Sequence, residues 1–225
     1  MKREERSAKA AGLLAALLWI VFGITLVIRV MAGDGGMLAA EMLQAAPPEV
    51  SGLPAEEYPD VGAMIASYLT GGTEEFQYRE YFQPHEAAHM ADCRELIRLD
   101  LWVCVLCGAA AAALTAFGLV RRAGRERFLR GILWGLRTAG VIAAGLGIWA
   151  LVNFNGLFVT FHKVAFTNDG WLLNPKTDLL LRLMPTQFFT SLGIRGLLWA
   201  LLAPAALEIL ARTGLAKVRD EKGDS

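Results

Sequence analysis

The sequence predicts an all-α integral membrane protein with four transmembrane helices and two extracytoplasmic insertions. Two observations lead to this fold class. Hydrophobic residues make up 55% of the 225 residues, and they are gathered into long blocks instead of alternating with polar residues. The charged residues, 22 basic and 22 acidic, lie mostly between these blocks. We therefore expect a single membrane domain that covers residues 1–225.

Four apolar blocks are each long enough to cross roughly 30 Å of hydrocarbon at about 1.5 Å per residue. We expect spans at about residues 10–31, 99–120, 131–152 and 189–211. The apolar core of the first block is too long for a typical cleaved signal peptide, so we expect it to be retained as a span. The fourth block is the least apolar, because it contains Arg195, Pro204 and Glu208.

Basic residues predict the orientation, because lysine and arginine are enriched in cytoplasmic loops. They cluster before the first block, between residues 121 and 130, and after residue 211. The long segment at residues 33–98 contains few cations and many carboxylates. We therefore expect both termini in the cytoplasm and two outer segments, at about residues 33–98 and 153–188. Basic runs that mark topology give no reason to expect a nucleic-acid partner.

The two outer segments are expected to be helical in part. In the first, short helices are expected near Met37–Gln44 and Val61–Leu69, with prolines between them. A further helix is expected to begin near Pro84 and to run into the second span. The second segment has apolar pieces that are too short to cross the membrane, which favours helices that lie at the interface.

The residues best suited to proton transfer are the three histidines, and all of them fall in the outer segments. They are His85, His89 and His162. Histidine titrates near pH 6.5 and can both accept and donate a proton at neutrality. Cys93 follows His89 by one helical turn, which also raises the hypothesis of a Cys–His dyad. Cys104 and Cys107 lie inside a predicted span, where small packing residues are expected.

One reading of the histidines is a zinc metalloprotease. Residues 85–89 read HEAAH, which matches H-E-x-x-H. On a helix, His85 and His89 would share a face and could hold Zn²⁺, with Glu86 as the general base. The pattern needs a third ligand, and no candidate has a diagnostic spacing. The small-residue stretch Cys107–Ala113 leaves a third hypothesis open, a membrane scaffold without catalytic activity.

Two longer motifs point to a different function. The first is Glu86-x-x-His89-Met90-x-Asp92, just before the second span. The second runs from Phe161-His162 through Phe166, Asn168-Asp169 and Trp171 to Asp178, Pro185 and Phe188-Phe189. Together they resemble the E-x-x-H-M-x-D and F-H-x-x-F motifs of the bacterial lipoprotein intramolecular transacylase (Lit) family. The chain departs from the family pattern at Cys93, where valine is usual, and at Ala165, where phenylalanine is usual; His85 is additional.

The resemblance implies a reaction, a substrate and a location. An enzyme of this family moves the sn-2 acyl chain of a diacylglyceryl-cysteine to its α-amino group, which forms a lyso-form lipoprotein. The partners are then the modified N-terminus of a lipoprotein and membrane lipid, at the outer face of the bacterial cytoplasmic membrane. No cofactor or metal is expected. The expected catalytic residues are His89 and His162, and which of them is the base stays open.

Five further residues are expected to support the two histidines. Glu86 and Asp92 lie three residues before and after His89, so that either can neighbour it on a helix and stabilise its charged form. Asp178 is expected to orient His162 or to bind the substrate ammonium. Asn168 is expected to cap or turn the second segment, and Trp171 to lie at the membrane interface.

Overall fold

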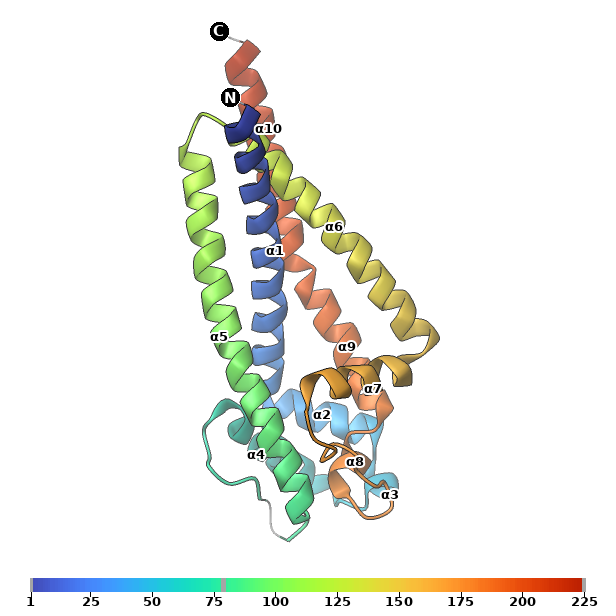
Figure 1. Ribbon diagram of the computed structural model, residues 1–225. Helices are drawn as coiled ribbons and strands as arrows, with labels where there is room; N and C mark the ends of the chain where they lie inside the picture. The colour runs from blue at the N-terminus through green and yellow to red at the C-terminus, as the bar shows by residue number, and fades with distance from the viewer. Residues whose placement is uncertain (1, 78–79, 224–225) are drawn as a thin grey trace. The chain divides into compact units, whose positions relative to one another are not determined.

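The computed structural model describes residues 2–77 and 80–223, which form helices and the loops that join them, with no strand in these two ranges (Figure 1). Four helical stretches are long and apolar enough to cross a membrane: Arg6–Gly33, Pro84–Val120, Arg125–Val152 and Thr186–Glu221. The prediction of an all-α protein with four long apolar helices is therefore confirmed. The second stretch contains 37 residues, far more than the roughly 20 that the hydrocarbon core requires, so its polar first turns extend beyond the core.

The elements follow one another in the order α1 (Lys2–Gly33), α2 (Gly35–Ala45), α3 (Pro48–Ser51), η1 (Ala55–Glu57), α4 (Tyr58–Thr70), α5 (Pro84–Val120), α6 (Arg125–Val152), α7 (Phe154–Ala165), α8 (Leu179–Leu183), α9 (Thr186–Ala200) and α10 (Leu202–Gly223). The short helices expected from the sequence correspond to α2 and α4. The helix expected near Pro84 is α5, which begins at that residue.

Local sequence accounts for several helix ends. The side chain of Asp34 accepts a hydrogen bond from the Met37 amide and caps α2. Gly71 ends α4 in the left-handed conformation, with φ of +87°, where a side chain would be strained. The apolar stretch near the C-terminus is divided into α9 and α10 because Pro204 has no amide hydrogen to donate to the Ala200 carbonyl.

The chain divides into two compact units, and the first contains residues up to Leu26, Trp102–Ile148 and residues from Leu198 onward. Close backbone approaches hold this unit together. A Cβ atom added at Gly12 would overlap the Phe128 carbonyl, and one at Gly131 would overlap the Lys9 carbonyl. Small residues at such contacts allow helices to pack tightly in the absence of a hydrophobic driving force from water. The Trp19 indole also donates to Thr115 Oγ1 at 3.0 Å.

The second unit contains Val27–Leu101 and Trp149–Leu197, and it holds every candidate site residue. Its core is apolar and is built from α2, α4, α8 and the start of α9, with members such as Met42, Ile65 and Phe188. Helices α2 and α4 meet at Gly35 and Gly62, where a Cβ atom on Gly62 would overlap the Gly35 carbonyl and lie 2.8 Å from the Ala39 Cβ.

We expect Gly62→Ala to destabilise the protein. The added methyl group would meet backbone of α2, which cannot move aside cheaply, and overpacking of this kind costs about 1–3 kcal/mol. The melting temperature in detergent should fall by several degrees. Gly193→Ala is the matched control, because a Cβ atom there meets nothing within 4 Å. Equal melting temperatures for the two variants would contradict the packing described for α2 and α4.

Candidate active site

Helix α5 begins with a hydrogen-bonded cap that fixes its first turn. Glu86 is the third residue of the helix, and its Oε2 accepts from the Gln83 amide at 2.7 Å, as in a capping box. Its Oε1 accepts from the Leu180 amide, in α8, at 2.6 Å. The Glu86 side chain is fully buried. Both carboxylate oxygens therefore bind backbone amides, and Glu86 positions the helix that carries His89 without using either oxygen on the imidazole.

Helix α7 presents the second histidine. Its first turn is capped by the side chain of Asn153, which accepts from the Gly156 amide at 2.8 Å. Phe154, Phe158 and His162 are spaced four residues apart and therefore share one face. His162 Nδ1 lies 2.8 Å from the Phe158 carbonyl oxygen. Because a carbonyl can only accept, the Nδ1 atom carries a proton, and in the neutral ring Nε2 has the lone pair.

The structure brings His89 and His162 together. Their ring centroids are 6.2 Å apart, and the ring planes are inclined by 32°. Each side chain is 8% exposed. The two residues are separated by more than seventy positions in the sequence, yet they come from the two motifs that the sequence singled out. Their assignment as catalytic residues stays a prediction.

Aromatic rings enclose the pair. The ring centroid of Phe166 lies 5.3 Å from that of His89 and 5.6 Å from that of His162. The ring centroid of Trp171 lies 5.0 Å from that of His162, and the ring centroid of Phe158 lies 4.1 Å from it. Trp171 therefore packs on an imidazole, a contact that its interpretation as an interface residue did not include. An environment of this kind keeps water away from both histidines and strengthens electrostatic interactions between them and any bound group.

The surroundings of His89 favour its neutral form. Burial lowers the pKa of His89, and the positive charge of a protonated His162 lowers it further, while the negative charge of Asp92 opposes both effects. His89 Nε2 lies 3.6 Å from Cys93 Sγ. His89 Nδ1 is buried and has no hydrogen-bond partner within residues 2–77 and 80–223. One ring nitrogen of each histidine thus contacts another group of the protein. Among the described residues, no hydrogen bond occupies the other ring nitrogen.

Asp92 and Asn168 join the two motifs directly. The Asn168 side-chain amide donates to Asp92 Oδ2 at 2.9 Å, and Asn168 Oδ1 accepts from the Gly170 amide at 2.8 Å. The first bond links α5 to the loop after α7, and the second shapes the turn that leads to Trp171. The turn role expected for Asn168 is present, and it is combined with a link to α5 that the sequence alone does not reveal.

Asp178 lies next to His85 instead of orienting His162. Its Oδ2 accepts from the Asn174 amide at 2.8 Å and lies 3.0 Å from His85 Nε2, while Oδ1 accepts from the Thr177 hydroxyl at 2.6 Å. Burial by itself would raise the pKa of Asp178. The hydrogen bonds from Thr177 and Asn174, together with His85, outweigh it and lower the pKa from 3.8 to about 2. Asp178 is therefore an ionised anchor for the 174–178 turn.

The H-E-x-x-H pentapeptide does not assemble a metal site. His85 faces Asp178, whereas His89 faces His162. Within the described residues, no group of three or more His, Cys, Asp or Glu side chains is placed to hold a metal ion. The nearby thiol is also a poor nucleophile, because burial, and then the charge of Asp92, raise the pKa of Cys93 to about 12.

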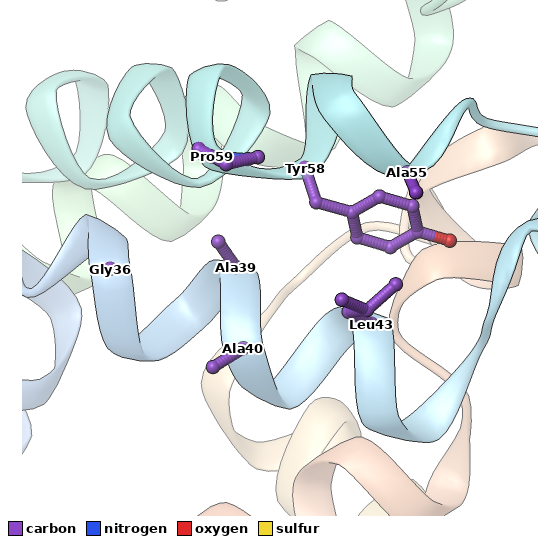
Figure 2. A pocket seen from close by; sticks show the side chains of 7 residues that line it. All are labelled: Gly36, Ala39, Ala40, Leu43, Ala55, Tyr58 and Pro59. Atoms are coloured by element: carbon purple, nitrogen blue, oxygen red, sulfur yellow. The ribbon is translucent and has the colours of Figure 1, made fainter.

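A separate apolar cavity of about 260 Å³ lies between α2 and the segment formed by η1 and the start of α4 (Figure 2). Its lining residues are Gly36, Ala39, Ala40, Leu43, Ala55, Tyr58 and Pro59. Tyr58 forms one wall, and its hydroxyl is held by Ser51 Oγ at 2.6 Å and by the Ala46 carbonyl. None of these residues belongs to the histidine site.

Comparison with known proteins identifies the family. The sequence profile described as "Lipoprotein intramolecular transacylase Lit" matches residues 13–189, which is most of the chain. The chain belongs to the lipoprotein intramolecular transacylase (Lit) family. No curated protein sequence matches it individually. Among solved structures, Lit from Bacillus cereus is similar with a TM-score of 0.79 and 19% identity, over 97% of this chain and 99% of that one.

Two variants of the Bacillus cereus protein, each with one histidine replaced, are similar as well. Both have TM-scores of 0.72, with 18% and 20% identity, and they are covered over 96% of their length by 98% and 97% of this chain. At these identities the structural likeness shows a shared fold. Together with the family profile, it confirms a multi-pass membrane protein.

Membership of the Lit family settles the class of activity. The chain is an acyltransferase, a lipoprotein intramolecular transacylase, and its substrate is a lipoprotein. The prediction made from the two motifs is therefore confirmed at this level. The two alternative hypotheses, a zinc metalloprotease and a non-catalytic membrane scaffold, are therefore wrong.

Some features of this candidate site could not be predicted from the sequence. The Phe158 carbonyl, which fixes the tautomer of His162, is a backbone group and leaves no signal beyond the expectation of a helix around residue 162. The i, i+4 spacing of His89 and Cys93 predicted their contact, although the hypothesis then concerned Cys93 as a nucleophile. The contact of Asp178 with His85 could not be predicted, because His85 lies more than ninety residues earlier in the chain.

We expect Asp178→Asn to destabilise the protein at neutral pH. An asparagine would turn an NH₂ group toward groups that donate hydrogen bonds, and such a loss costs about 1–3 kcal/mol. Because the folded-state pKa of Asp178 is about 2 and its ordinary value is 3.8, its contribution is present above pH 4 and is lost as the pH falls toward 2. The wild type should therefore lose more melting temperature between pH 4 and pH 2 than the variant does.

The control is Asp169→Asn, which removes an exposed carboxylate from the same segment. It should melt as the wild type does at both pH values. If Asp178→Asn and Asp169→Asn behave alike, Asp178 does not anchor the turn.

Proposed function

We propose that this Lit-family enzyme moves the sn-2 acyl chain of a diacylglyceryl-cysteine onto the α-amino group of the same cysteine. The product is an N-acyl, S-monoacylglyceryl lipoprotein. His89 and His162 assist the proton transfers. The observation that carries the proposal is the 6.2 Å separation of two buried imidazole rings from the two motifs.

The chemistry requires few protein groups. An α-ammonium, whose pKa is about 8, first loses a proton to become a nucleophile. The amine attacks the ester carbonyl, a C–N bond forms, and negative charge develops on the carbonyl oxygen. The C–O bond then breaks, and the glyceryl oxygen receives the proton that the nitrogen gives up. Nucleophile and ester belong to one molecule, so orientation alone can supply a large part of the rate.

The spacing of the rings suits this reaction. A catalytic imidazole must come within about 2.6–3.2 Å of the atom it serves, so two hydrogen bonds end to end span about 5–6 Å. Rings with centroids 6.2 Å apart can therefore address the same ester and amine. Their burial supports the proposal further, because charge that develops in a site with little water is stabilised strongly by fixed donors.

The supporting residues act through position. Asp92 and Asn168 hold the two motifs together at 2.9 Å. Trp171 packs against His162 and limits the orientations of its ring. Glu86 fixes the first turn of α5, and Asp178 fixes the turn before α8. In this proposal, the site binds the diacylglyceryl-modified N-terminus of a lipoprotein, which enters the site from the surrounding membrane lipid.

The proposal places the site on the outer face of the bacterial cytoplasmic membrane. Residues 1–225 form one membrane domain, with spans at about 10–31, 99–120, 131–152 and 189–211. The distribution of basic residues supports cytoplasmic termini. Within the first unit, the start of α1 and the end of α10 lie at the same end, which supports placing both termini on one side of the membrane (Figure 1).

Mass spectrometry of a lipoprotein N-terminus tests the reaction. Acyl migration leaves the total mass unchanged, but fragmentation shows one chain on the amine. We expect His89→Ala and His162→Ala each to lower the rate by about 10²–10⁴, because each removes a proton-transfer or hydrogen-bonding group from the reacting atoms. His85→Ala is the matched control and should retain activity, since His85 faces Asp178. If His89→Ala and His162→Ala both form the lyso-form product as fast as the wild type, the proposal is wrong.

Labelling tests the topology. In a variant whose three cysteines have been replaced, Thr73→Cys lies in the first outer segment, and Ala123→Cys lies in the loop between α5 and α6; both positions are exposed. A membrane-impermeant maleimide should label Thr73→Cys in intact cells and Ala123→Cys only after lysis, because the basic loop is retained inside. The reverse pattern would show that the site faces the cytoplasm.

A further inference from the structure

Cys93 lies one helical turn after His89 and touches its ring. The distance from Cys93 Sγ to His89 Nε2 is 3.6 Å, within the range of a hydrogen bond to sulfur. Burial, and then the charge of Asp92, raise the pKa of the Cys93 thiol to about 12. At neutral pH the sulfur therefore keeps its hydrogen, and an S–H group faces the imidazole nitrogen.

The two nitrogens of His89 have different surroundings. Nε2 faces the thiol, whereas Nδ1 is buried and has no hydrogen-bond partner in the described part of the chain. A thiol is a weak donor and its sulfur is a weak acceptor, while the lone pair of a neutral imidazole nitrogen is a good acceptor. The favourable arrangement is therefore S–H donating to Nε2. A neutral ring that accepts at Nε2 carries its single proton on Nδ1.

We propose that Cys93 is a positioning residue that holds His89 with its proton on Nδ1 and thereby makes His89 the hydrogen-bond donor to the oxyanion. The proposal rests on the proposed function of the site. It assigns His89 and His162 different roles, because their free nitrogens have opposite character. His89 offers Nδ1–H, and His162, whose Nδ1 donates to the Phe158 carbonyl, offers the lone pair of Nε2.

The two roles account for every proton. After the α-ammonium has released one proton to solvent, His162 Nε2 accepts a second proton from the amine as the C–N bond forms. The tetrahedral oxygen accepts a hydrogen bond from His89 Nδ1–H, which keeps its proton throughout. His162 then returns its proton to the glyceryl oxygen as the C–O bond breaks, which leaves an amide, an alcohol and a neutral imidazole.

The charged groups around His89 agree with a donor that stays neutral. His162 faces it from α7, and Asp92 and Cys93 face it from α5. Burial and the charge of a protonated His162 both lower the pKa of His89, which favours the neutral ring that the donor role requires. A permanent Nδ1–H is the kind of fixed donor that stabilises an oxyanion most effectively.

Nitrogen NMR of the full-length protein, labelled with ¹⁵N-histidine and held near pH 8, tests the tautomer directly. The chain has only three histidines, so His85→Ala and His162→Ala variants identify the signals of His89. We expect a protonated Nδ1 and an unprotonated Nε2 for His89 in the wild type. Cys93→Val, which has a similar volume and no donor, should raise the Nε2-protonated fraction. Cys93→Ser, which restores a donor, should return the spectrum toward that of the wild type.

The kinetic test uses the same two variants. One neutral hydrogen bond is worth enough to change a rate about two- to tenfold, so Cys93→Val should lower kcat by that factor with KM little changed. Cys93→Ser should recover most of the loss, which a purely structural role for the buried side chain would not produce. A His89 protonated on Nε2 in the wild type, or a Cys93→Val variant with unchanged kcat, would overturn the proposal.

The NMR spectra do not depend on the reaction. If the wild type lacks the expected tautomer of His89 while activity still requires His89 and His162, only the role of Cys93 is rejected. Full activity of the His89→Ala and His162→Ala variants would reject the proposed function, whatever the spectra show.

Discussion

The buried carboxylate of Glu86 is the interaction on which the site-bearing unit depends. One oxygen binds the Gln83 amide at the start of α5, and the other binds the Leu180 amide at the start of α8, ninety-four positions away. A fully buried carboxylate is stable only when backbone or cationic donors satisfy it, and here two amides do so. Because His89 follows Glu86 by one turn, the same two bonds fix where the first imidazole lies.

The second imidazole arrives by a different route and meets the first within an apolar enclosure. Helix α7 carries His162 on the face that also presents Phe158, and the loop after it returns Phe166 and Trp171 to the two rings. The bond between Asn168 and Asp92 closes this loop against α5. The polar groups of the site are thus few and are positioned by backbone contacts, while the aromatic rings exclude solvent from the atoms that would react.

The sequence was sufficient for the features that depend on composition and on local spacing. Long apolar blocks specify helices whatever their neighbours, and the two motifs led to the family that the sequence profile identifies. The sequence was insufficient where the hydrogen-bond partner of a side chain comes from a distant part of the chain. Glu86 and Asp178 were expected near the imidazoles as orienting groups, but buried carboxylates bind whichever donors surround them. For Glu86 these are amides, and for Asp178 they include His85.

The break near Leu201 shows the same limit at the level of a helix. Hydropathy treats residues 189–211 as one block, because an average over a window is insensitive to a single missing donor. The missing amide hydrogen of Pro204 nevertheless ends α9 and starts α10. Local chemistry therefore divided a segment that the apolar pattern alone had joined.

The group that orients His162 is a main-chain oxygen of its own helix, and this has an evolutionary consequence. In a triad, the orienting carboxylate is a side chain and can be lost by one substitution. Here, any residue at position 158 that keeps α7 helical supplies the same acceptor. The orientation of this imidazole is inherited with the secondary structure, so a change of the Phe158 side chain leaves the acceptor of His162 in place.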